Sequence, residues 1–311
     1  MVFRKFEFRI YPNKKQALRL DHQLEPGTEI YNQLLTICKE EFLENEIKLG
    51  RYDLEYYLTL FRKNNQQYRA MYRFTLMQIA KRLSQNLNEF FKRTSEWKKG
   101  NGDKPGPPRY KKKIRSIDFD SLSVKILDNR TVKIGRIGTV EAVIHRKIEG
   151  EVKGTTVIKK ASGKWYIIFT CELEVEVVMM ADKGDVGIDV GVTRFATLSD
   201  GTVIDNPRFL LKSEKRIKRL QKDLSRKQKG SNNWKRSKLL VAIAYERVEN
   251  QRNDFLHKLS RQFVNDYGLI AVESLGIEEM LADRKMAKSI SDVSWYKFIR
   301  MLEYKASSAG S

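Results

Sequence analysis

The chain has 311 residues and a formal charge of +21, with 60 Lys and Arg against 39 Asp and Glu. This length accommodates about two domains at roughly 150 residues each. Hydrophobic residues make up 41% of the sequence, which excludes a wholly disordered chain, and no apolar run approaches the ~18 residues that span a bilayer.

The N-terminal segment predicts one strand followed by helices. Apolar and charged residues alternate from Val2 to Ile10, which is the pattern of a half-buried strand. Thr28 is a candidate cap for a helix whose apolar positions continue to Phe42, and Asp53 is a candidate cap for a second helix. A third helix is expected from about Met71 to Trp97 because leucines and aromatic residues recur there at helical spacing.

A segment rich in Gly, Pro and Lys follows, and after it the apolar period changes to two. This alternation predicts short antiparallel strands within Ile117–Leu122, Ser123–Leu127, Thr131–Ile134, Gly138–His145, Thr155–Lys160 and Lys164–Glu172. Together with the first strand, they predict a β-barrel with the helices inserted between its first two strands.

The second half of the chain predicts a separate α/β domain, so the overall expectation is a multidomain α+β fold. The apolar run from Leu269 to Val272 is typical of a buried parallel strand, and a final helix is expected from about Trp295 to Ala306. Two long basic helices precede that run. The other expected strands are Gly184–Val192, Phe195–Leu198 and Thr202–Ile204.

The positive charge is concentrated in two blocks. Lys92–Arg115 carries a net +8 in 24 positions and Arg208–Lys238 a net +11 in 31, so these windows hold 19 of the 21 net charges. Clustered Lys and Arg neutralise phosphates, which is the main term in nucleic-acid affinity. The blocks therefore predict a nucleic-acid partner and no membrane.

Each block offers candidate phosphate contacts. In the first block, a Pro-rich turn exposes basic side chains next to an aromatic ring that can stack on a base. In the second, basic side chains surround an apolar helical seam with few acidic residues to balance them. The candidates are Arg109, Tyr110, Lys111, Lys112 and Lys113 in the first block and Arg216, Arg219, Lys222, Arg226 and Lys227 in the second.

Two carboxylates are candidate metal ligands. Asp189 stands in mid-strand between Gly187 and Gly191, where an unpaired carboxylate is costly and a hard cation such as Mg²⁺ would supply the balancing charge. Glu273 ends the apolar run of the predicted parallel strand. If the two strands are adjacent and parallel, both carboxylates lie at one sheet edge, as a two-metal phosphodiester hydrolase requires. Taken singly, Asp189 could instead cap a turn and Glu273 could begin a helix.

The order of motifs resembles a known family. GIDVGVTRFATLSDG, a basic helical hairpin and LIAVESL are similar to the first two motifs of the RuvC-type nuclease in the TnpB/OrfB proteins. These are transposon-encoded, RNA-guided DNA nucleases related to the type V CRISPR effectors. The resemblance covers essentially the whole chain, because the other family segments follow in order as FEFRIYPNKKQ, KPGPPRYKKK, GKWYIIF and WYKFIRMLEYKA.

The resemblance implies an RNA-guided DNA endonuclease with a two-metal Mg²⁺ site, in which Asp189 and Glu273 are the first two catalytic ligands. Its partners would be a guide RNA derived from the transposon end and a target double-stranded DNA. The implied domains are a β-barrel wedge domain at residues 1–10 and 115–180, a helical recognition domain at 11–114 and a RuvC-like nuclease domain at 181–311.

The chain also departs from the family pattern. Family members carry a four-Cys zinc ribbon and a third catalytic Asp beyond the WYKFIRMLEYKA helix, whereas this sequence has two cysteines and no Asp after Asp292. Asp292 is interpreted as a helix N-cap before Trp295 rather than as a substitute ligand. We therefore expect no zinc in this chain, weak or absent nuclease activity for the polypeptide 1–311, and a reducing bacterial or archaeal cytoplasm, next to the nucleoid.

Two alternatives remain open on the sequence. One is a nuclease-deficient, RNA-guided DNA-binding protein that acts as a repressor. The other is an actin-like ATPase or sugar kinase, because DVGVT from Asp189 to Thr193 fits the short Asp-x-Gly-x-Thr phosphate loop of that fold.

Overall fold

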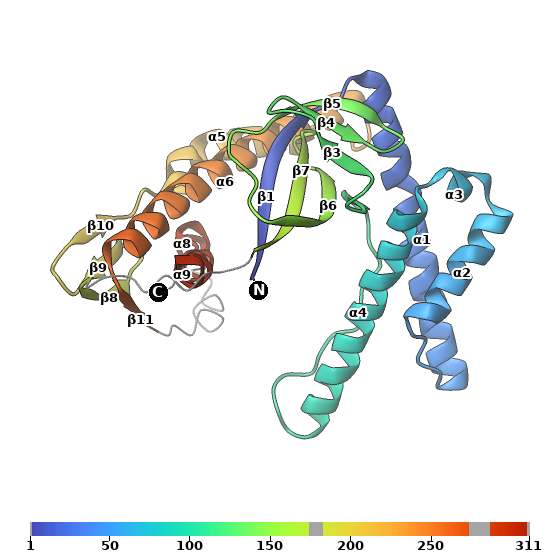
Figure 1. The fold of residues 1–311 in the computed structure, drawn as a ribbon, viewed down its shortest axis with the longest axis horizontal. Coiled ribbons are helices and arrows are strands. Elements are labelled where there is room, and N and C mark those ends of the chain that lie inside the picture. Colours follow the sequence, from blue (N-terminus) through green and yellow to red (C-terminus); the bar gives the residue numbers. More distant parts are fainter. Residues whose placement is uncertain (1, 174–182, 274–286, 310–311) are drawn as a thin grey trace. The chain divides into compact units, whose positions relative to one another are not determined.

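The computed structural model describes residues 2–173, 183–273 and 287–309. The chain divides into two compact units, residues 3–173 and residues 174–311 with the first two residues. Figure 1 shows the elements of each unit. No helix within the described ranges is long and apolar enough to cross a membrane.

The first unit combines a seven-stranded sheet with four helices. Sheet order is β2-β6-β7-β1-β5-β4-β3, a near-closed antiparallel barrel. All four helices lie between β1 and β2 in the chain, which confirms the predicted helical insertion. The elements are β1 Val2–Tyr11, α1 Lys14–Asn45, α2 Arg51–Asn64, α3 Gln66–Ala70, α4 Arg73–Lys98, β2 Ser116–Phe119, β3 Val124–Ile126, β4 Thr131–Ile134, β5 Gly138–Val143, β6 Glu151–Lys159 and β7 Trp165–Leu173.

Helix α1 joins the two cores of this unit. Leu20 and Leu24, near its start, are buried in the barrel core, whereas Ile30 and Leu34, further along, are buried in the helical core. One continuous helix therefore holds the helical insertion against the barrel. Burial of apolar area in both cores favours keeping the helix unbroken.

Two helix starts differ from the sequence-based prediction. Helix α1 begins at Lys14 with a capping box between Asn13 and Gln16, so Thr28 lies inside the helix rather than at its start. The prediction was wrong because Pro26 resembles a helix boundary, yet packing on both sides of it keeps the helix continuous. Asp53 is the third residue of α2, and its carboxylate accepts the Gly50 N–H at 2.8 Å.

The second unit is built on a four-stranded sheet in the order β10-β9-β8-β11. Its core faces one side of the sheet, where Phe195 of β9 packs edge-to-face on Phe298 of α9 at 5.0 Å between ring centroids. The elements are β8 Asp185–Val190, β9 Arg194–Leu198, β10 Val203–Asp205, α5 Phe209–Ser225, α6 Asn232–Asp266, β11 Leu269–Val272, α8 Ala287–Val293 and α9 Trp295–Ala309. The predicted strands and both long helices are confirmed, and α8 was not predicted.

Both cysteines are buried apolar residues. Cys38 lies in the helical core and Cys171 in the barrel core, and neither forms a disulfide. Burial raises the pKa of the Cys38 thiol to about 11 and also raises that of Cys171. Both thiols are therefore protonated at neutral pH and belong to the cores.

Candidate metal centre and nucleic-acid surfaces

Asp189 lies on the open face of the β8–β9–β11 sheet. Val186, Ile188 and Val190 of β8 are buried, whereas Asp189 between them is exposed. Alternation along the strand thus directs its carboxylate away from the core, as predicted. Gly191 follows the strand, and a side chain there would meet the Arg194 carbonyl oxygen at 3.0 Å, so a close backbone approach requires this glycine.

Glu273 takes the position next to Asp189 across the sheet. Strand β11 pairs with β8 in parallel, with Val272 opposite Ile188, and the Glu273 N–H donates to the Ile188 carbonyl at 3.4 Å. The next residues along the two strands are Glu273 and Asp189, and paired positions project to the same face of a sheet. The predicted parallel pairing is confirmed, and it brings both carboxylates to one edge.

Both carboxylates are available to a ligand. Asp189 and Glu273 are exposed, and neither carboxylate forms a hydrogen bond or ion pair with another residue in the described part of the chain. Hard oxygen donors without a protein partner suit a cation such as Mg²⁺. Within the described ranges, no group of three or more His, Cys, Asp or Glu side chains is placed to hold a metal.

Two hydroxyl side chains, from β9 and from the residue that follows it, lie on this face and were not predicted from the sequence. Thr197 is the register partner of Asp189, and Ser199 accepts the Gly187 N–H at 3.0 Å through its hydroxyl. Their signal in the sequence was the alternation of Thr197 and Ser199 with the buried Ala196 and Leu198. A water or phosphate bound near Asp189 would meet these hydroxyls.

Asp292 binds other residues of the same unit through its carboxylate. Its carboxylate accepts the Leu210 N–H at 3.1 Å and the Arg252 guanidinium at 2.7 Å, and its side chain is only 10% exposed. It therefore caps the N-terminus of α5, not of α9 as the sequence suggested. The prediction of a capping role was right in kind but named the wrong helix, since the capped amide lies 82 residues earlier in the chain.

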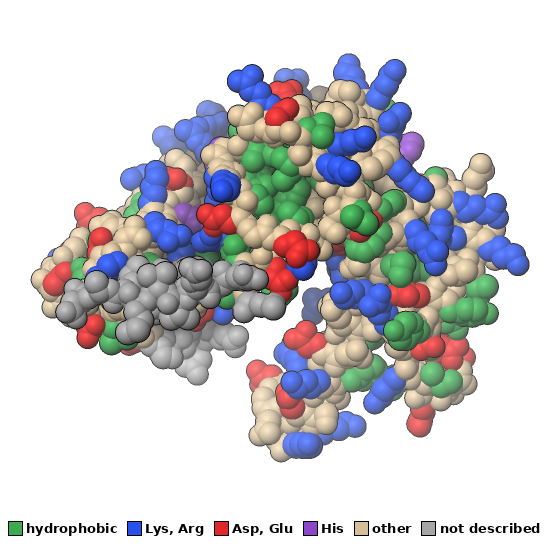
Figure 2. All heavy atoms as spheres, in the orientation of Figure 1, with side chains coloured by type: hydrophobic (Ala, Val, Ile, Leu, Met, Phe, Trp, Pro, Cys, Tyr) green, Lys and Arg blue, Asp and Glu red, His purple; other side chains and the backbone are tan. Residues whose placement is uncertain are grey.

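The α5–α6 hairpin carries the second basic block around an apolar seam. Ile217 is buried against Ala244 and Val248, and Leu220 packs at the edge of this cluster. Figure 2 shows Lys and Arg side chains along the hairpin with few acidic ones among them. The acidic residues of α5 pair with nearby lysines, Glu214 with Lys218 at 2.7 Å and Asp223 with Lys227, just past the helix end, at 3.1 Å.

Of the five hairpin residues predicted to contact phosphates, four form no ion pair with the described residues. Lys227 is engaged by Asp223, whose pKa is lowered first by the Ser237 hydroxyl and then by Lys227. The other four are exposed and have no ion pair with any residue that the structure describes: Arg216, Arg219, Lys222 and Arg226. Their charge is therefore available to phosphates.

The first basic segment is fastened along helix α1. Asn32 accepts the Lys111 N–H at 2.8 Å and donates to the Lys111 carbonyl at 3.0 Å. Thr28 accepts the Ile114 N–H at 2.9 Å, and the Thr36 and Tyr110 hydroxyls are 3.2 Å apart. Residues 28, 32 and 36 lie on one face of the helix. Residues 109–114 thus form a fixed strap along α1 rather than a free loop.

Two side chains of the strap contact residues of α1, and its other basic side chains are exposed. The Lys111 ammonium lies 4.6 Å from the Tyr31 ring, where burial lowers its pKa, and Lys39 lies 4.1 Å from the Tyr110 ring. Tyr110 is nevertheless 51% exposed. The exposed Arg109, Lys112 and Lys113 have no ion pair within the described ranges.

Comparison with known proteins identifies the family. An OrfB family model described as "Probable transposase" matches residues 169–284, and a model described as "Helix-turn-helix domain" matches residues 1–46. "Putative RNA-guided DNA endonuclease InsQ" of Escherichia coli is 31% identical over 247 residues, covering 74% of this chain and 59% of its own. The chain belongs to the TnpB/OrfB family. Its segment 1–46 folds as strand β1 and the single helix α1.

Other relatives and one solved structure are also similar to the chain. A "Putative RNA-guided DNA endonuclease" of Streptomyces pristinaespiralis is 28% identical over 311 residues, covering 98% of this chain and 75% of the relative. For a Mycobacterium tuberculosis relative of the same description, the identity is 28% and the chain spans 51% of its length. In fold, the chain resembles the Cas12f1 protein of a Cas12f1-sgRNA-target DNA complex, with a TM-score of 0.52 at 16% identity over 95% of this chain and 71% of that one.

Replacing Asn32 with Ala should release the strap. The variant loses both hydrogen bonds to the Lys111 backbone, and we expect trypsin to cleave after Arg109 to Lys113 about tenfold faster. Limited proteolysis followed by mass spectrometry measures the rate at each bond. Glu40→Ala, an exposed change on the same helix, is the control and should cleave at the wild-type rate.

Replacing Asp292 with Asn should destabilise the second unit by about 2 kcal/mol, because the Arg252 charge then loses its nearly buried partner and α5 loses a cap. Thermal or denaturant unfolding measures the change. Asp254→Asn removes an exposed i,i+4 partner of Lys258 and should cost less than about 0.5 kcal/mol. Equal effects of the two substitutions would contradict the capping role.

Proposed function

We propose that this chain binds a guide RNA and a target DNA and that Asp189 and Glu273 supply two ligands of a RuvC-type nuclease centre. The observation that supports this most is the parallel pairing of β8 and β11, which aligns two unpartnered carboxylates on one face. The names of the relatives and the complex in which the similar fold occurs point the same way.

The donor set fits a hard divalent cation. Both proposed ligands are carboxylates, both are exposed, and the glycine beside them on β8 adds no side chain to the same face. Mg²⁺ held by Asp189 and Glu273 would activate a water and stabilise the leaving oxygen of a phosphodiester. Thr197 and Ser199 can hydrogen-bond phosphate oxygens or water next to the two carboxylates.

The basic surfaces position the nucleic acid. Helix α5, which the chain inserts between the two carboxylate-bearing strands, and the residue that ends it carry the free basic side chains Arg216, Arg219, Lys222 and Arg226. A strand bound there is led toward the β8–β11 edge. The strap, through Arg109, Tyr110, Lys111, Lys112 and Lys113, would bind a second stretch of backbone, with Tyr110 as a stacking surface.

In this proposal the predicted domains take the family's roles. The barrel at residues 1–10 and 115–180 serves as the wedge, and the helices of residues 11–114 serve as the recognition domain. Residues 181–311 serve as the RuvC-like domain with a basic hairpin insertion. The guide RNA derives from the transposon end, and the protein works in the cytoplasm at the nucleoid.

RNA extracted from the purified chain tests the proposal directly. We expect one discrete RNA species with a segment that directs binding to a complementary DNA duplex. Asp189→Asn should retain this binding, because the change leaves the basic surfaces intact. Random cellular fragments, or binding that ignores the RNA sequence, would contradict the proposed function.

Substituting the four free hairpin residues by Ala should weaken binding of that duplex at every sequence. We expect the dependence of log K on log salt to become shallower by about 3 to 4, since each lost phosphate contact contributes ~0.9. Lys218→Ala, whose ammonium already pairs with Glu214, is the control for a single charge and should change the slope less than Arg219→Ala.

A further inference from the structure

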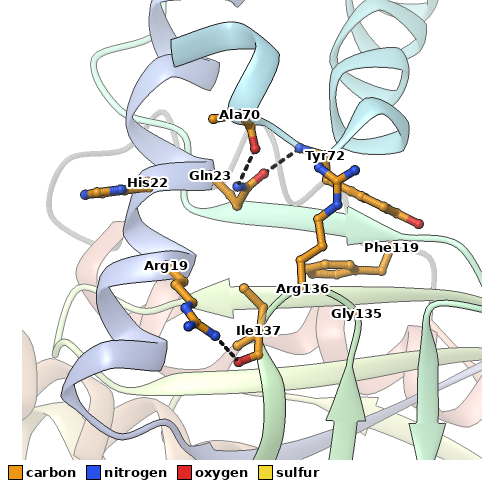
Figure 3. A pocket seen from close by; sticks show the side chains of 9 residues that line it. All are labelled: Arg19, His22, Gln23, Ala70, Tyr72, Phe119, Gly135, Arg136 and Ile137. Atoms are coloured by element: carbon orange, nitrogen blue, oxygen red, sulfur yellow. Dashed lines mark hydrogen bonds between the residues drawn. The ribbon is translucent and has the colours of Figure 1, made fainter. Parts of the chain in front are cut away.

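A pocket of about 260 Å³ lies where the barrel meets the helices in the first unit (Figure 3). Side chains of α1 form one side, the connection from α3 to α4 forms the top, and the turn after β4 forms the other side. The His22 imidazole points away from it. The residues that matter here are Arg19, Gln23, Tyr72, Phe119, Arg136 and Ile137.

Arg136 holds an unusual backbone conformation at the rim. Its φ is 62°, in the left-handed region that L side chains rarely adopt and glycine adopts without strain. Its guanidinium lies 5.5 Å from the Tyr72 ring centroid and forms no ion pair with the described residues. The fold thus maintains a strained backbone at a residue whose side chain lines the pocket.

The other polar groups of the pocket are fixed by the protein. The side-chain Oε1 of Gln23 accepts the Tyr72 N–H at 2.7 Å, and one Arg19 guanidinium nitrogen donates to the Ile137 backbone carbonyl at 3.2 Å. The remaining Arg19 donors and those of Arg136 are unused. The nearby Asp120 carboxylate is taken up by the Tyr72 and Ser123 hydroxyls.

The residues that line the pocket indicate the chemistry of the ligand that would fit it. Two guanidinium groups and no carboxylate line the pocket, so the ligand must offer oxyanions. The apolar lining comes from the half-buried Tyr72 ring and from the edges of Phe119 and Ile137, which are otherwise buried in the barrel core, and it suits the face of a planar ring. A nucleotide combines these two features, because its phosphate is an oxyanion and its base is a planar ring.

We propose that this pocket binds one nucleotide of a bound nucleic acid, with its phosphate on Arg19 and Arg136 and its base against the aromatic and aliphatic wall. The proposal rests on the proposed function for the presence of a nucleic acid and adds a single-nucleotide site to it. The nucleotide can belong to RNA or to DNA, and the test separates these sources.

Arg136→Gly in the full chain is the decisive variant. Glycine relieves the backbone strain, so the melting temperature should stay equal or rise, while the phosphate contact is lost. Fluorescence anisotropy with labelled single-stranded RNA, single-stranded DNA of the same sequence and duplex DNA measures binding. We expect about a tenfold loss of affinity for the probe whose nucleotide enters the pocket.

Arg130→Ala is the matched control, since it removes one exposed arginine that precedes β4 and lies outside the pocket. It should weaken binding less than about threefold. Photocrosslinking with a 4-thiouridine RNA or a 4-thiothymidine DNA should label the peptides carrying Tyr72 or Phe119 in the wild type and not in Arg136→Gly.

If Arg136→Gly binds all three probes as the control does, or if crosslinks fall outside these peptides, the nucleotide site is wrong while the proposed function stands. If the wild type binds none of the probes, both fail.

Discussion

The parallel pairing of β8 with β11 is the constraint on which the candidate site depends. Alignment of Val272 with Ile188 directs both of these side chains into the core, so the following residues, Glu273 and Asp189, must emerge together on the open face. A shift by one residue would bury Glu273 and expose Val272. The apolar core under the sheet therefore fixes the geometry of the two carboxylates.

Helical packing likewise holds the two basic surfaces in place. Because α1 is anchored in both cores of its unit, its polar face can hold the strap through Thr28, Asn32 and Thr36. In the second unit, Asp292 and Arg252 fix the start of α5. Basic side chains held on such rigid supports lose little conformational entropy when they bind phosphates.

The sequence predicts those features whose signal is local. The strand pattern around Asp189 and the short apolar run before Glu273 were sufficient to place both carboxylates, and charge density located the basic segments. Features that depend on distant partners were missed. The uninterrupted α1 depends on packing around Pro26, and the target of the Asp292 cap and the strain at Arg136 have no local signature. The sequence from Asp189 to Thr193 also fits the phosphate loop of the actin-like fold. At that stage, only the order of the motifs along the chain favoured the nuclease family.

Anomalous diffraction from crystals of the protein soaked in Mn²⁺ tests the central claim most directly. The account predicts an anomalous peak about 2.0–2.2 Å from carboxylate oxygens of both Asp189 and Glu273, absent from crystals of Asp189→Asn. A peak held by other residues, no peak at saturating metal, or a Glu273 side chain on the core face of the sheet would contradict it.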